Sequence, residues 1–370
     1  MRIALIAPLY ERVPPEMYGG TERVVYCLAE ELVRRGHAVT LFASGDSLTS
    51  AELVPGAPQS LRRRMTRDQL VMFGPPLHLA MLAQVSQRAD EFDIIHSHID
   101  HWAFPFSRLI DVPMVSTIHG RLDVPDLDSI FRLYPETALV SISDSQRRPF
   151  DHLKPNWVAT VYNGITTDRF TFNPEPGDYL VFLGRLSQEK RPDRAIEIAR
   201  RVGMPLKIAA KVDPLDQEYF QTQIEPLLHH PLIEYVGEVD DTGKDELLCR
   251  AYATLFPIDW PEPFGLTMIE SLACGTPVIA MRNGSVPEVM VDGVTGFICE
   301  TVDEMAAALS GVAGLDRAAC RRHVESRFSA EVMADGYEAV YRTLLERESM
   351  AIPGVHTNGH QREKVRLLIA

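Results

Sequence analysis

The stretch Trp260-Pro261-Glu262-Pro263-Phe264-Gly265-Leu266-Thr267-Met268-Ile269-Glu270 decides the fold, because it leads from a buried strand into a helix and carries two carboxylates. Residues 253–256 predict the strand, and residues 257–263 predict a loop. Residues 266–273 predict the helix, which the run Gly275-Thr276-Pro277 ends. A strand that passes through a loop into a helix is the building unit of an α/β protein.

The loop delivers Glu262 to the positive end of the predicted helix. Backbone N–H groups of Phe264, Gly265 and Leu266 are unpaired at a helix start, so this end is a ready anion site. Glu270 lies about two turns along the same face. An anionic leaving group can therefore sit between the two carboxylates. Two glutamates at this spacing are also common on solvated helices, so the spacing alone leaves a structural role open.

The composition indicates a globular chain of two domains. The residues are 45% hydrophobic and 24% charged, so the chain can bury large cores. At 370 residues the chain is too long for one ordinary domain. A formal charge of -14 argues against nucleic-acid binding, which needs a basic face. Five scattered cysteines without CxxC spacing fit reduced thiols and a cytoplasmic location. Residues 1–9 predict a first strand rather than a signal peptide, and no run has the length of a membrane span.

The first half of the chain predicts a parallel sheet. Residues 3–7 and 39–43 are apolar strands, and they flank an amphipathic helix that Thr21 is expected to cap and Gly36 to end. Ligands gather at the carboxyl ends of such strands. Further strands are expected at residues 93–96, 114–118 and 139–142.

Two features of this half lie at the expected ligand edge. Gly19 and Gly20 precede the first helix, where small residues let the backbone approach a ligand, although a generic turn explains the pair equally well. The pair matches neither a dinucleotide-binding nor a P-loop motif. His119 ends the strand at 114–118, so its imidazole is expected to point into the cleft unless it is merely structural.

Two other clusters carry weaker signals. His96, His98 and His101 suggest a metal site, but no cysteine or carboxylate completes a ligand set, so we expect no bound metal. The densest basic run precedes an apolar-rich helix, and a solvated helix face explains it best. Contact with an anionic membrane surface, as a peripheral protein at the inner face, is the alternative. The run consists of Arg62, Arg63, Arg64 and Arg67.

Residues 166–177 contain Pro174 and Pro176 and predict an interdomain linker. A second series of strands and helices follows. Arg185 and Lys190 leave the tip of its first strand, where a guanidinium and an ammonium can bind the two phosphates that carry a departing charge. Exposed basic residues are often only solvated. The strands expected in this half lie at 179–183, 206–209, 233–236, 253–256 and 278–280.

These motifs together resemble the family 4 retaining glycosyltransferases, the group 1 glycosyl transferases of the GT-B fold. The run from Glu262 to Glu270 resembles the E-x7-E signature of that family. Residues 184–192 resemble its G-R-L-x-x-x-K-G element, with Arg191 where glycine is usual. Gly19-Gly20-Thr21-Glu22 resembles the glycine-rich first loop, which faces the donor diphosphate and the acceptor, and His119-Gly120 resembles the histidine that contacts the donor sugar.

The resemblance implies an α/β protein of the GT-B fold, with two Rossmann-like βαβ domains facing across a cleft. The expected units are an acceptor-binding domain at 1–168, a nucleotide-sugar domain at 178–334, a helix at 335–348 that crosses back to the first domain, and a tail at 349–370. Some relatives use a basic surface of the first domain to meet anionic lipid, which bears on the arginine run.

The resemblance also implies the reaction, which is transfer of a sugar from a nucleotide-diphosphate sugar to an acceptor hydroxyl with retention of configuration. It favours a UDP-sugar such as UDP-glucose, no metal, and no cofactor beyond the donor substrate. Arg185 and Lys190 would stabilise the leaving diphosphate, Glu262 would hold the sugar hydroxyls and Glu270 the ribose hydroxyls. Relatives also bind nucleotide at positions matching Lys211, Val236 and Glu238. A nucleotide-sugar epimerase and a catalytically silent sugar-nucleotide binding protein are the alternatives.

Overall fold

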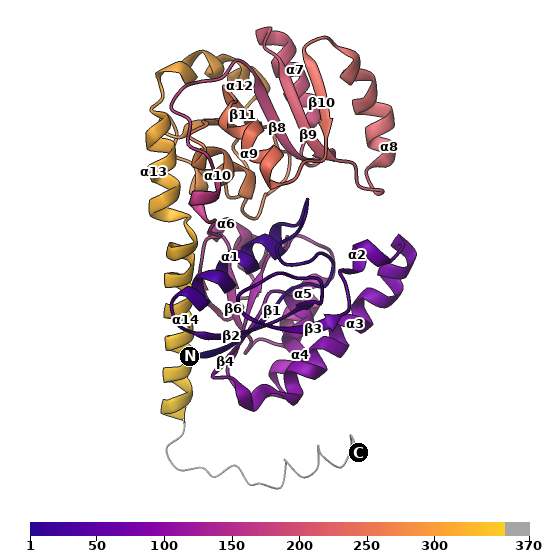
Figure 1. The fold of residues 1–370 in the computed structure, drawn as a ribbon, viewed down its shortest axis with the longest axis vertical. Helices are drawn as coiled ribbons and strands as arrows, with labels where there is room; N and C mark the ends of the chain where they lie inside the picture. Colours follow the sequence, from indigo (N-terminus) through magenta and orange to yellow (C-terminus); the bar gives the residue numbers. More distant parts are fainter. Residues whose placement is uncertain (352–370) are drawn as a thin grey trace.

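Continuous apolar runs form the strands of two separate parallel sheets in the computed structural model, which describes residues 1–351. The first sheet has seven strands in the order β3-β2-β1-β4-β5-β6-β7, and the second has six in the order β10-β9-β8-β11-β12-β13. Both are wound outward from a central strand with helices on both faces (Figure 1). The prediction of two Rossmann-like domains is confirmed.

The elements of the first sheet and its helices are β1 (Arg2–Ile6), α1 (Gly20–Arg34), β2 (Ala38–Ser44), β3 (Glu52–Ala57), α2 (Leu61–Arg64), α3 (Arg67–Gln87), β4 (Ile94–Ser97), α4 (Phe104–Ser107), β5 (Met114–Ile118), α5 (Leu127–Leu133), β6 (Ala138–Ser141), α6 (Asp144–Arg147) and β7 (Trp157–Thr160). The elements of the second are β8 (Leu180–Arg185), α7 (Pro192–Val202), β9 (Leu206–Lys211), α8 (Gln217–Tyr219), β10 (Ile233–Gly237), α9 (Asp241–Cys249), β11 (Ala253–Phe256), α10 (Leu266–Ala273), β12 (Val278–Met281), α11 (Val286–Val289), β13 (Gly296–Cys299), α12 (Val302–Ala308) and α13 (Arg317–Arg327), after which α14 (Ala330–Ala351) ends the described chain.

Helix α1 begins earlier than its sequence predicts. Its first backbone hydrogen bond runs from the Arg23 N–H to the Gly19 carbonyl at 3.2 Å, so Gly19 is the cap and Thr21 lies inside the helix. The apolar face is buried as expected, with Val24, Val25 and the following turns packed on the first sheet. This two-residue shift places the glycine pair directly at the helix N-terminus.

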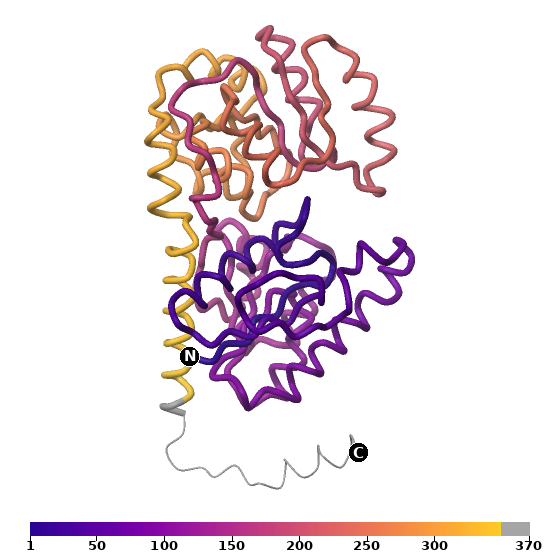
Figure 2. The backbone as a smooth tube through the Cα atoms, in the orientation of Figure 1, coloured from indigo at the N-terminus to yellow at the C-terminus, as the bar shows by residue number. Residues whose placement is uncertain are grey.

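Two segments of the chain cross between the domains, and they touch each other. The Ile165 N–H donates to the Phe328 carbonyl at 2.9 Å, and the Ala330 N–H donates to the Ile165 carbonyl at 2.9 Å. A Cβ atom at Gly164 would lie 2.3 Å from the Ser329 carbonyl oxygen, so only glycine allows this approach. Figure 2 follows both crossings along the backbone. The backbone thus passes between the domains twice, and the two crossing segments lie side by side.

Helix α14 runs back along the first domain and buries Tyr337 and Tyr341 in its core. It begins at Ala330 rather than at the expected residue 335, because Ser329 caps it by accepting a hydrogen bond from the Val332 N–H at 3.3 Å. The expected tail at 349–370 lies mostly outside the described residues, which end at 351.

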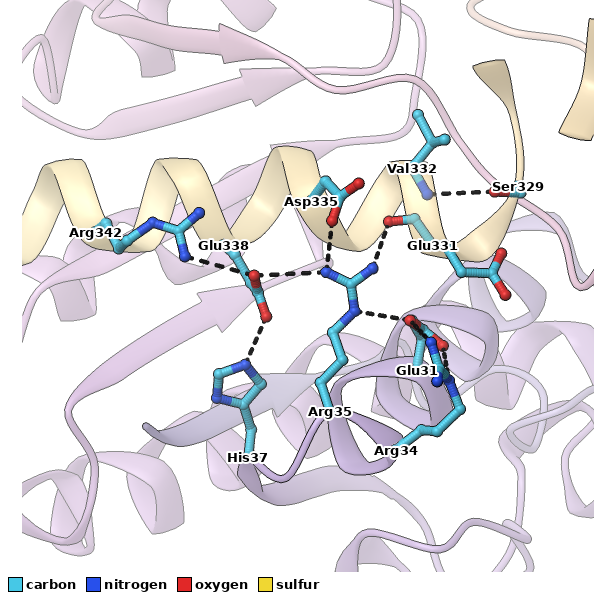
Figure 3. A network of polar contacts seen from close by, with 10 residues as sticks. All are labelled: Glu31, Arg34, Arg35, His37, Ser329, Glu331, Val332, Asp335, Glu338 and Arg342. Carbon is cyan, nitrogen blue, oxygen red and sulfur yellow. Dashed lines mark hydrogen bonds and ion pairs between the residues drawn. The ribbon is translucent and has the colours of Figure 1, made fainter. Parts of the chain in front are cut away.

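A set of ion pairs, here called the α14 anchor, ties this helix to the end of α1 (Figure 3). Arg35 pairs with Asp335 at 2.7 Å and with Glu31 at 2.7 Å, and its guanidinium also donates to a backbone carbonyl of α14. The His37 Nε2 atom lies 2.8 Å from Glu338 Oε1. The α14 anchor comprises Glu31, Arg35, His37, Asp335 and Glu338.

No helix within residues 1–351 combines the length and the apolar character needed to cross a membrane.

Candidate active site

A cavity of about 620 Å³ lies between the carboxyl ends of the two sheets and is lined by both domains. The first domain contributes the glycine pair and His119, and the second contributes the two cations and both glutamates of the opening motif. The structure therefore brings together twelve of the thirteen predicted site residues, which are Gly19, Gly20, His119, Arg185, Lys190, Lys211, Glu238, Glu262, Phe264, Gly265, Leu266 and Glu270.

Val236 is the exception, since it does not line the cavity. The pairing of β10 with β9 shifts between Tyr235 and Gly237, so Val236 is an extra residue in the strand. The bulge turns the chain so that Glu238 and Val239 face the cavity instead. Sequence alternation alone could not locate such a shift.

The opening motif places a helix N-terminus at the cavity wall. Gly265 caps α10 in the left-handed conformation with φ 82°, and a Cβ atom there would lie 2.7 Å from the end of the Met268 side chain. Phe264 is buried, and its carbonyl accepts a hydrogen bond from Ser285 Oγ at 2.7 Å. The positive end of α10 is therefore held rigidly toward the cavity.

Lys190 and Glu262 form an ion pair beside this helix end. The Lys190 ammonium also lies 5.2 Å from the centre of the Trp260 ring and 5.5 Å from that of Phe256. Only 8% of Glu262 is exposed, so its carboxylate depends on this cation for compensation. The pair joins the two motifs that the sequence analysis singled out separately.

Arg185 ends β8 between two carboxylates. Its guanidinium lies 3.4 Å from Glu189 and 3.6 Å from Asp216. Glu189 is also paired with Arg121, which comes from the first domain. These three partners were not predicted. Asp216 and Arg121 are remote in the sequence from the residues they pair with, whereas Glu189 lies only four residues after Arg185.

A network of four charges, here called the cleft network, extends from Glu270 to the first domain. Lys244 Nζ donates to Glu270 Oε1 at 2.5 Å and lies 3.5 Å from Asp241, which in turn pairs with Arg23 of α1 at 2.6 Å. The side chains of Lys244 and Glu270 are 9% and 5% exposed. All four residues line the cavity, and three of them were missed by sequence reasoning.

His119 follows β5 and belongs to a set of buried histidines. Its Nε2 atom shares a hydrogen bond with His98 Nδ1 at 2.9 Å, and its backbone N–H donates to Asp100 at 2.8 Å. Burial lowers the pKa of His119 to about 3, so the ring is neutral at ordinary pH. His96 instead bonds Tyr341 of α14 at 2.7 Å. Among the described residues, no group of three or more His, Cys, Asp or Glu side chains is placed to hold a metal.

The two domains also touch through their loops at the cavity. A Cβ atom at Gly20 would lie 3.5 Å from Leu266, so the N-termini of α1 and α10 approach each other. The Tyr18 N–H donates to Glu238 at 3.2 Å. Glu22 is buried in the same wall, and burial raises its pKa to about 7. The two domains are therefore in direct contact beside the cavity.

The arginine run divides between the cavity and the surface. Arg62 lines the cavity and pairs with Glu11 at 3.2 Å, whereas Arg63 and the rest of the run do not line it. The neighbouring apolar side chains of α3 are exposed, namely Val71, Met72 and Phe73.

Two family models match consecutive parts of the chain. The model described as Glycosyltransferase Family 4 matches residues 18–169, and the model described as Glycosyl transferases group 1 matches residues 165–312. The chain is similar to the glycogen synthase of Mycobacterium tuberculosis, with 28% identity over 92% of this chain and 94% of the relative.

Solved glycosyltransferase structures share the fold. AviGT4, a glycosyltransferase involved in avilamycin A biosynthesis, superposes with a TM-score of 0.72 at 22% identity, covering 94% of this chain and 98% of its own. HepE of Anabaena, solved in complex with UDP-glucose, gives 0.70 at 16% identity, covering 93% of this chain and 100% of its own. The GT-B prediction is confirmed by these neighbours. With the two family models covering residues 18–312 between them, the chain belongs to the family 4, group 1 glycosyltransferases.

Proposed function

We propose that the enzyme transfers a hexose from a UDP-sugar such as UDP-glucose to an acceptor hydroxyl with retention of configuration. The observation that carries this proposal is the convergence of Arg185, Lys190 and the N-terminus of α10 on one cavity. Three sources of positive potential at one place suit a leaving group that departs with negative charge. The HepE structure in complex with UDP-glucose supports the choice of donor.

In the proposed reaction, the bond between the anomeric carbon and the diphosphate oxygen breaks while the acceptor oxygen bonds to the same face. The proton of the acceptor hydroxyl passes to the departing diphosphate. Arg185 and Lys190 stabilise the diphosphate, and Glu262 accepts hydrogen bonds from the sugar hydroxyls. His119, which is neutral, offers the sugar a ring nitrogen without adding charge. No cofactor beyond the donor takes part.

Incubation with UDP-glucose, with and without extracts that supply acceptors, tests the proposal. Release of UDP that depends on an acceptor is expected, and nuclear magnetic resonance of the product is expected to show the donor's anomeric configuration. Conversion of the donor to another UDP-sugar without release of UDP would identify an epimerase. Binding without any turnover would identify a silent sugar-nucleotide protein.

We further propose that the transfer needs no metal, since the cations that face the leaving group are side chains. Turnover is expected to persist in excess EDTA. Loss of turnover in EDTA that magnesium or manganese restores would contradict this part of the proposal.

The exposed face of α2 and α3 supports the proposal that the protein contacts the inner face of an anionic membrane as a peripheral protein. Val71, Met72 and Phe73 are 74%, 65% and 46% exposed beside the arginine run. The protein is expected to float with phosphatidylglycerol vesicles and not with phosphatidylcholine vesicles at about 0.1 M salt. Failure to float with either would remove the membrane from the proposal.

A further inference from the structure

We propose that Lys244 is a positioning residue for the nucleotide, which holds the Glu270 carboxylate so that one of its oxygens accepts hydrogen bonds from the ribose of a nucleoside diphosphate. This inference rests on the proposed function, in which Glu270 binds the ribose hydroxyls. It adds a residue that no motif in the sequence indicates.

The geometry divides the two oxygens of Glu270 between two tasks. Lys244 Nζ donates to Oε1 at 2.5 Å, which leaves Oε2 available to a ligand in the cavity that both residues line. A carboxylate can accept from several donors, and it accepts most strongly when it is ionised. Lys244 thus supplies a fixed partner on one side of a carboxylate whose other side faces the ligand.

Burial makes the cation necessary. With side-chain exposures of 5% for Glu270 and 9% for Lys244, either charge alone would be strongly unfavourable in this wall. The pair also turns the carboxylate to one orientation, because the lysine is itself confined between Glu270 and Asp241 and lies over the Phe170 ring at 5.6 Å. The direction of Oε2 is therefore set before a ligand arrives.

The position of Lys244 in its helix is electrostatically unfavourable for a cation. It lies in the first turns of α9, close to the N-terminus that Asp240 caps, where the helix dipole disfavours positive charge. Arg23 occupies the same kind of position in α1. Both cations are held against their helix dipoles by the carboxylates of the cleft network, which links the ribose site to the first domain.

The test compares ligands that differ only at the ribose. UDP, ADP and GDP are first titrated into the wild-type enzyme to find the nucleotide that binds most tightly. The affinity for that nucleotide is then compared with the affinity for its 2′,3′-dideoxy counterpart. Wild type is expected to prefer the ribose form by about 10-fold or more, the scale of hydrogen bonds to a charged group. Lys244→Met is expected to bind the two forms within a factor of about three. Glu270→Gln is expected to lose the same preference.

The double variant Lys244→Met/Glu270→Gln removes both buried charges together. Its preference for the ribose form over the dideoxy form is expected to be no lower than that of either single variant. Lys207→Met is the matched control, because it makes the same substitution at a more exposed pair with Glu234, away from the cavity in the same domain. It is expected to keep the wild-type preference.

If Lys244→Met retains the full preference for ribose, or weakens both ligands by one common factor, the positioning role is overturned. Asp241→Asn, at a side chain that is 44% exposed, is the second variant should Lys244→Met fail to fold, and a reduced preference is expected there too. An unchanged preference in that variant would overturn the inference as well. A wild-type enzyme that binds none of the three nucleotides would instead contradict the proposed function.

Discussion

The α14 anchor and the cleft network are built alike and placed differently. Each alternates acids and bases that come from distant parts of the chain, and each ends on helix α1. Each joins a buried pair to a more exposed acid. In the anchor, the Arg35 and Glu31 side chains are 18% and 5% exposed, and Asp335 is 69% exposed. In the cleft network, Lys244 and Glu270 are 9% and 5% exposed, and Asp241 is 44% exposed. Exposed pairs contribute about 0–1 kcal/mol, and removal of one partner of a buried pair costs about 3–5 kcal/mol. Only the cleft network lines the cavity, so charge changes there should alter function.

The largest effect is expected beside the cleft network, at the cations that face the leaving group. Arg185→Ala or Lys190→Ala should lower turnover at saturating donor by about 10²-fold or more, the scale of losing one stabiliser of developing charge. Circular dichroism should show an unchanged fold. The matched control is Lys207→Ala, which removes a cation from the same domain away from the cavity. Near-normal turnover in either cleft variant would count against a diphosphate clamp.

A smaller effect is expected where the cleft network reaches the first domain. Arg23→Met removes the cation that pairs with Asp241 at 2.6 Å and should raise the donor KM by about 10-fold, since a contact between the domains is lost. Arg35→Met makes the same change in the α14 anchor and should lower the melting temperature while leaving KM unaltered. The comparison between the two networks breaks down if both variants behave alike in both assays.

The buried histidines beside the cavity and the α14 anchor should also respond to acid at different pH. Burial lowers the pKa of His119 to about 3 and holds those of His96 and His98 well below their usual value of 6.5. The unfolded chain then binds more protons below about pH 6.5, so stability should fall from there downward. In the anchor, the hydrogen bond from His37 lowers the pKa of Glu338 below 4.5, so its contribution is lost only under stronger acid.

Melting temperatures measured at intervals from about pH 8 to about pH 3 check this order. His98→Gln should flatten the decline between about pH 7 and about pH 5, and Glu338→Gln should change the curve only below about pH 4.5. If His98→Gln leaves the decline in melting temperature near neutral pH unchanged, groups other than His98 cause that decline.

The smallest effect is expected at the most exposed end of the anchor. Asp335→Asn should lower the melting temperature by about 2 °C or less, because the Asp335 side chain is 69% exposed. Differential scanning calorimetry at low and high salt measures the change, and the difference from wild type should shrink as salt rises. A larger loss would mean that the exposure of Asp335 does not limit the strength of its pair with Arg35.

The sequence predicts the parts of this site that are local in the chain. The run around Phe264 and Gly265 predicts a loop and a helix start because turn chemistry and apolar periodicity act over a few residues. The same holds for His119, which ends a short apolar strand. Lys244, Arg23 and Glu189 gain their roles from partners remote in the sequence, with Arg23 and Asp241 separated by 218 positions. A single sequence does not indicate which remote residues will be in contact. It also gives no local signal for the bulge at Val236.

The paired crossings at Ile165 and Ser329 have a consequence for how this molecule can be cut and rejoined. Since α14 completes the core of the first domain, that domain is discontinuous in the chain, and the second domain is an insertion within it. The two ends of the insertion are hydrogen-bonded neighbours. A short link from residue 165 to residue 329 could therefore close the first domain without its companion, and the excised segment could be carried on another scaffold with adjacent attachment points.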